Sequence, residues 1–113
     1  MEETKLGTVR IAPSVLATIV SLTVRNISGV AGMTAITHPP GRVVQRTSTG
    51  HAPGVTLQVR GGAVSTDVYV VAAPDSNLRR LGQAIQSHVR EALDQMVGME
   101  ADQVNVYIED VTE

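Results

Sequence analysis

The three histidines are the side chains of this sequence best suited to binding a metal ion, and two of them, His38 and His51, share one segment. A closed zinc site needs four ligands, and the chain has no cysteine that could complete one. The third, His88, precedes Val89 at the edge of a predicted helical apolar stripe. We therefore expect solvated loop or boundary histidines, with no metal and no cofactor.

Acid–base catalysis needs two groups that converge in a cleft with shifted pKa values. The carboxylates Glu109, Asp110 and Glu113 lie at the C-terminus and Asp67 on the polar face of a predicted sheet, and nothing in the sequence places two of them together in a cleft. A Gly-x-Ser-x-Gly motif is absent, and the glycine pairs lack the spacing and lysine of a phosphate-binding loop. These patterns predict a protein that is not an enzyme and has no small-molecule substrate.

Tyr69 and Tyr107 are the only aromatic residues in the chain. Strand alternation puts both on one predicted sheet face, together with Gln58, Arg60 and Asp67. Tyrosine and arginine are favoured at the centres of protein interfaces, so these five residues are the candidate interaction site. RNA-binding sheets also stack bases on such aromatics, which leaves a nucleic-acid-binding regulatory module as the alternative. A third interpretation is that tyrosine simply suits half-exposed strands.

Length and composition restrict the class of protein further. The chain has 113 residues, which suits one domain over 1–113, and 42% of them are hydrophobic, too many for a disordered chain. A net charge of −2 argues against non-specific binding to nucleic acid or anionic lipid. The charge-free segment 11–24 is shorter than the roughly 20 residues of a membrane-spanning helix, and no signal peptide is evident. We expect a cytoplasmic protein.

The elements that position these side chains begin with an alternating segment, 8–11, which predicts a strand with Val9 and Ile11 directed inward. A helix is expected from Pro13 onward, ended by a left-handed residue at Asn26 or Gly29. Segment 30–36 is a weak strand candidate. Segment 37–54 is rich in turn residues and is predicted to be a long mobile loop.

The clearest pattern is a hairpin. Two alternating runs flank Gly61-Gly62, whose lack of side chains allows the positive φ angles of a tight turn. The turn sets Val59 opposite Val64, and Leu57 opposite Thr66. The apolar residues of both strands then share one face, and the tyrosine-bearing face is polar.

A second helix is predicted after the hairpin, with Asp75 or Ser76 as its N-cap and Gly98 at its end. Its apolar stripe consists of Leu78, Leu81, Ile85, Val89, Ala92 and Met96. A final strand covers 104–108. Together these elements predict an α+β two-layer sandwich with βαββαβ-like order, in which two helices cover one face of a small, mostly antiparallel sheet.

Several stretches resemble the alkaline shock protein family, also called envelope stress response proteins. They are 7–13, 15–19, 29–33, 54–57, 64–71, 89–99 and 104–108, and together they span nearly the whole chain. The resemblance implies a non-enzymatic interaction or scaffold protein of the alkaline or general envelope stress response. It implies self-association into a dimer or higher oligomer. It also implies peripheral attachment at the inner face of the cell membrane through a membrane-anchored partner. The family has no established catalytic residues to carry over.

Overall fold

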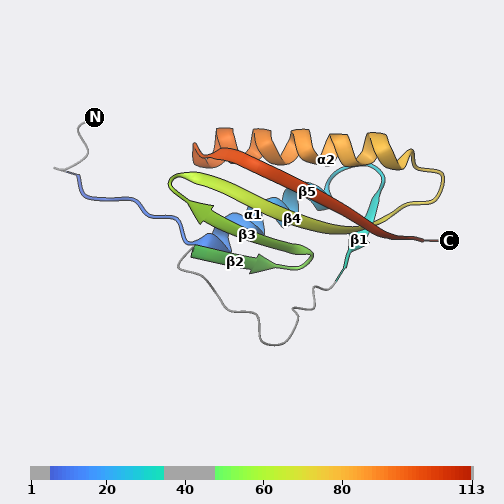
Figure 1. Cartoon of the computed structure of the whole chain (residues 1–113), viewed down its shortest axis with the longest axis horizontal. Coiled ribbons are helices and arrows are strands. Elements are labelled where there is room, and N and C mark those ends of the chain that lie inside the picture. Colours follow the sequence, from blue (N-terminus) through green and yellow to red (C-terminus); the bar gives the residue numbers. More distant parts are fainter. Residues whose placement is uncertain (1–5, 35–47, 113) are drawn as a thin grey trace.

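The computed structural model describes residues 6–34 and 48–112. Two helices and a five-stranded sheet form the body of the protein (Figure 1). The elements in chain order are α1 (Pro13–Arg25), β1 (Val30–Met33), β2 (Ser48–Ala52), β3 (Val55–Arg60), β4 (Ala63–Ala72), α2 (Leu78–Ala92), a π-helical turn η1 (Leu93–Val97) and β5 (Glu100–Val111).

Strand β4 is the centre of the sheet. Along one edge it pairs antiparallel with β3 up to Val68 and then with β1 from Val70 onward, while β5 runs parallel along its other edge. Strand β2 extends the sheet beyond β3. Helix α1 packs on β2 and β3, and α2 packs on β5 and on α1. The predicted α+β sandwich, with two helices against a mostly antiparallel sheet, is confirmed.

The core lies between the helices and the inward face of the sheet. The hairpin register is the predicted one, with Val59 opposite Val64 and Leu57 opposite Thr66. The side chains of Leu57, Val64 and Val68 are buried, whereas Gln58 on the alternate position is exposed. Buried Thr66 keeps its polar atom satisfied, because its hydroxyl donates to the Thr56 carbonyl at 3.0 Å.

Helix α1 begins at Pro13, as predicted, even though β-branched residues dominate its sequence. Its threonines satisfy their hydroxyls within the helix: Thr18 donates to the Ser14 carbonyl and Thr23 to the Ile19 carbonyl. The helix ends at Arg25 with Asn26 in a right-handed conformation, so the prediction of a left-handed Asn26 is wrong. Gly29 does have a positive φ, of 103°.

Helix α2 differs from its prediction at both ends. Its N-cap is Asn77, whose side chain accepts a hydrogen bond from the Arg80 amide, rather than Asp75 or Ser76. The buried stripe continues to Leu93, after which the helix widens into the π-helical turn η1. The wider turn rotates less per residue, so Met96 leaves the stripe and is exposed. Gly98 ends the helix as expected, with φ 74°.

Two predicted features at the sheet periphery need correction. Segment 8–11 forms no strand, and Val9, predicted to face inward, is 90% exposed. The segment has the side-chain alternation of a strand, but among the described residues no strand lies beside it to pair with. Part of the predicted loop 37–54 is in fact strand β2, paired with β3 over its whole length. Residues 53–54 form the turn between β2 and β3, and residues 37–47 of that predicted loop lie outside the described residues.

Candidate protein-interaction surface

The outer face of the sheet, opposite the helices, carries both tyrosines on adjacent strands. Tyr69 of β4 and Tyr107 of β5 are partners in the parallel register. Their rings stack with centroids 4.9 Å apart and planes inclined by 16°. Aromatic rings at this separation and angle attract one another beyond their burial alone. The 45% exposed Tyr107 leaves a large aromatic surface in contact with solvent.

A second cross-strand pair lies two residues before the tyrosines. Asp67 of β4 is the register partner of Asn105 in β5, and the Asn105 amide donates to the Asp67 carboxylate at 3.0 Å. Sequence alternation places Asn105 on this face, but β4 and β5 are separated by α2, so sequence alone does not pair the two. We call Tyr69, Tyr107, Asp67 and Asn105 the tyrosine patch.

The other two predicted site residues share the face but not the patch. Gln58 of β3 is opposite Ser65, and Arg60 is opposite Ala63 at the hairpin turn. Ala63 precedes Tyr69 by six residues, a distance of about 20 Å along a strand. Arg60 is therefore at the far end of the outer face, too distant to join one compact contact with the tyrosines.

The histidines provide no metal centre in the described part of the chain. No cluster of three or more His, Cys, Asp or Glu side chains occurs among the described residues. His88 is exposed on α2, with its Nδ1 atom 2.7 Å from the Ala84 carbonyl oxygen. His51 is in β2, and His38 lies outside the described residues.

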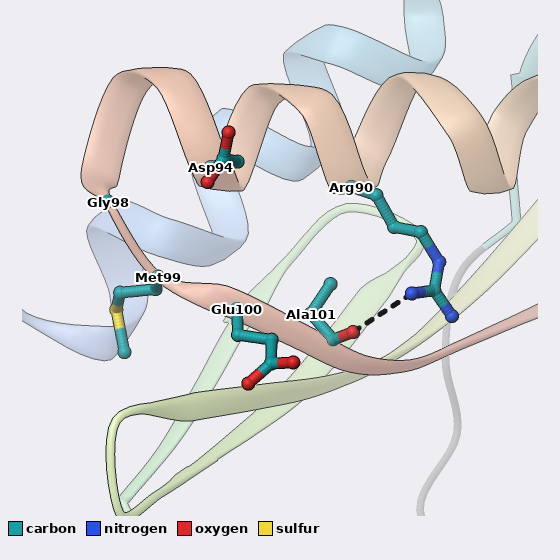
Figure 2. A pocket seen from close by; sticks show the side chains of 6 residues that line it. All are labelled: Arg90, Asp94, Gly98, Met99, Glu100 and Ala101. Carbon is teal, nitrogen blue, oxygen red and sulfur yellow. Dashed lines mark hydrogen bonds between the residues drawn. The ribbon is translucent and has the colours of Figure 1, made fainter.

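An open pocket of about 440 Å³ lies where α2 and η1 turn into β5, and its residues were not predicted as a site. It is lined by Arg90, Asp94, Gly98, Met99, Glu100 and Ala101 (Figure 2). The Arg90 guanidinium turns toward the strand and donates to the Ala101 carbonyl at 3.2 Å. Arg90 therefore ties α2 to β5 and acts as a structural link.

The chain is similar to known proteins in sequence and in fold. The chain is 27% identical over 107 residues to the uncharacterized protein YqhY of Bacillus subtilis (strain 168), covering 95% of this chain and 78% of that protein. It is 30% identical over 111 residues to the uncharacterized protein Spy1614 of Streptococcus pyogenes serotype M6, covering 96% and 90%. A solved MamM CTD variant matches with a TM-score of 0.50 at 13% identity, covering 87% and 93%, which shows a shared fold.

Two further findings concern membrane-spanning helices and the family of the chain. Among the described residues, neither helix has the length and apolar character needed to cross a bilayer. The family model of alkaline shock protein 23, whose members have a cell envelope-related function, matches residues 1–113. The resemblance seen in the sequence is thus confirmed, and the chain belongs to the alkaline shock protein 23 family.

Proposed function

We propose that this chain is a non-enzymatic interaction protein of the cell-envelope stress response. In this proposal it self-associates and binds a membrane-anchored partner from the cytoplasmic side. The family relationship supports the link to the envelope. The stacked pair of Tyr69 and Tyr107 on a sheet face left uncovered by the helices is the observation that carries the interaction role.

The tyrosine patch has the properties of a reversible contact surface. Stacking and the Asp67–Asn105 hydrogen bond hold its four side chains in place before any partner arrives, which lowers the conformational entropy lost on binding. The patch combines aromatic area with hydrogen-bonding groups, so it stays compatible with water when unoccupied. Tyrosine-centred surfaces of this kind are typical of interface centres.

The charges around the patch favour a protein over a nucleic acid. Asp67 is part of the patch, and the exposed carboxylates Glu109 and Asp110 follow Tyr107 on β5. Carboxylates repel phosphate groups, whereas single-strand binding surfaces combine aromatics with a positively charged groove. Binding of RNA that weakens steeply with salt would support the alternative function and contradict the protein-interface role.

Sedimentation velocity over a range of protein concentrations tests self-association. Tyr107→Ser removes the exposed ring, and it should shift the protein toward monomer while the circular dichroism spectrum stays unchanged. Arg79→Ser is the matched control, because Arg79 is an exposed residue on α2, away from the outer face. Association that is unaffected by Tyr107→Ser, or equally reduced by Arg79→Ser, would contradict a role for the patch.

Fractionation of cells tests attachment to the envelope. The wild-type chain should sediment with membranes in part, and washing with high salt or removing the membrane-anchored partner should release it. Tyr107→Ser should increase the soluble fraction, and Arg79→Ser should not. A chain that stays fully soluble in stressed and unstressed cells would contradict this part of the proposal.

A further inference from the structure

Residues 7–12 lie outside any helix or strand, although 8–11 have the alternating pattern of a strand, and none of the described strands pairs with them. Val9 is 90% exposed and Ile11 is 40% exposed, while Thr8 and Arg10 alternate with them. Figure 1 shows the segment leading away from the body of the protein before α1 begins. An alternating segment of this kind gains backbone hydrogen bonds and apolar burial once it pairs with a sheet edge.

The edge of β5 that faces away from β4 provides such a site. Helix α2 contacts this edge near the start of β5, where Arg90 donates to the Ala101 carbonyl and Gln86 donates to the Val104 carbonyl at 3.0 Å. Since backbone groups alternate along a strand, those of Val106 and Ile108 point the same way as the Val104 carbonyl, away from β4. The described residues contribute no hydrogen bond to that edge over 106–110.

The side chains of the two segments are complementary. Val106 and Ile108 are partly buried on the helix side of β5, and an added strand could cover them with Val9 and Ile11. The intervening Arg10 would then lie on the outer-face side, near the exposed carboxylates of β5. Opposite charges on neighbouring strands stabilise their pairing, so the charge pattern agrees with the apolar one.

The segment cannot reach this edge within its own chain. The Pro13 carbonyl lies against Gly50 in β2, so the end of the segment is fixed beside β2. Strands β3 and β4 separate β2 from β5, which amounts to three strand spacings or about 14 Å. Two residue steps from Ile11 to Pro13 cover about 7 Å at most. Residues 7–12 that pair with the β5 edge would therefore have to belong to another molecule.

We propose that residues 7–12 of one copy add as an extra strand to the β5 edge of a second copy, over residues 106–110. This inference rests on the self-association in the proposed function, but it uses the edge of β5 rather than the outer face. Donor and acceptor lie on different parts of one chain, so each copy can give a strand and accept one. The exchange can close as a symmetric dimer or continue along a chain of copies.

Cross-linking between two single-cysteine variants tests the pairing directly, because the natural sequence has no cysteine. Full-length Arg10→Cys is mixed with full-length Glu109→Cys and treated with a short bismaleimide. The control mixes Arg10→Cys with Gln58→Cys, an exposed outer-face residue on β3. We expect a covalent dimer in the first mixture only. No dimer in the first mixture, or equal yields in both, would overturn the proposal.

Substitution of the donor segment provides the second test. The double variant Val9→Asp, Ile11→Asp should raise the dissociation constant of the dimer by about tenfold or more, because neither side chain can then bury apolar surface on β5. Leu22→Asp is the control, since Leu22 is an exposed apolar residue on α1. If Leu22→Asp weakens association and the donor variant does not, the contact is on α1 and the proposal is wrong.

Measurements of self-association distinguish the β5 edge from the tyrosine patch as the contact surface. Loss of association in Tyr107→Ser alone, with the donor variant unaffected, would leave the proposed function standing and overturn the strand exchange. Loss in the donor variant alone would support the exchange and remove the tyrosine patch from self-association. A chain that is monomeric at every concentration would overturn both.

Discussion

Gly50 in β2 lies directly against the carbonyl oxygen of Pro13, the first residue of α1, and a Cβ atom at position 50 would overlap that carbonyl. The contact is between two backbones, so no side chain can rotate to make room. It joins the start of α1 to the outermost strand of the sheet. Only glycine at position 50 therefore allows β2 to lie this close to the start of α1.

Gly50→Ala should therefore destabilise the fold by about 2 kcal/mol or more, since an added methyl group in a packed site forces backbone shifts. Gly82→Ala is the matched control. Gly82 is inside α2, where an added Cβ meets no atom within 4 Å. That substitution should stabilise the protein by about 0.5–1 kcal/mol, because alanine is the better helix former. Urea denaturation of both variants measures the two opposite shifts.

Ser21 links α1 to the turn after β2. It is buried, and its hydroxyl donates to the Pro53 carbonyl at 2.9 Å. Ser21→Ala should lower the free energy of unfolding by about 1 kcal/mol, because the Pro53 carbonyl loses its partner. Thr18→Ala removes a hydroxyl that bonds within the exposed side of the same helix, and its effect should be near zero. Equal losses for the two variants would argue against the Ser21 contact.

The N-cap of α2 can be tested against the alternatives that the sequence offered. Asn77→Ala should destabilise the protein by about 1 kcal/mol, since the Arg80 amide loses its acceptor. Asp75 has a positive φ of 65°, a conformation that glycine tolerates without strain. Asp75→Gly should therefore cause no loss of stability. A larger loss of thermal stability for Asp75→Gly than for Asn77→Ala would show that Asn77 is not the stabilising N-cap.

A double-mutant cycle on Tyr69 and Tyr107 measures the stacking. Replacing each tyrosine by leucine keeps most of the apolar volume and removes the ring pair. The coupling energy should be about 0.5–1.5 kcal/mol in favour of the pair. The measurement is the unfolding free energy of the four proteins of the cycle. A coupling close to zero would mean that the two rings do not support one another and that the tyrosine patch is not preorganised.

Features controlled by neighbouring residues could be predicted from the sequence. The hairpin is one, because Gly61-Gly62 and the alternating runs beside it specify both the turn and the register. The start of α1 at Pro13 and the end of the second helix at Gly98 are others, since each depends on the conformational preference of one residue. The shared face of Tyr69 and Tyr107 also followed from alternation along their own strands.

Features that need a distant neighbour were decided by the tertiary structure. Segment 8–11 has the alternation of a strand, yet a strand forms only where a second strand pairs with its backbone, and the described part of the chain places none beside it. Segment 48–52 looks like a loop, yet it pairs with β3, and the absence of a side chain at Gly50 allows it to lie against the start of α1. The stacking of Tyr69 on Tyr107 arises from the parallel register of β4 and β5. That register depends on the connection through α2, which joins the two strands, and no local sequence pattern encodes it.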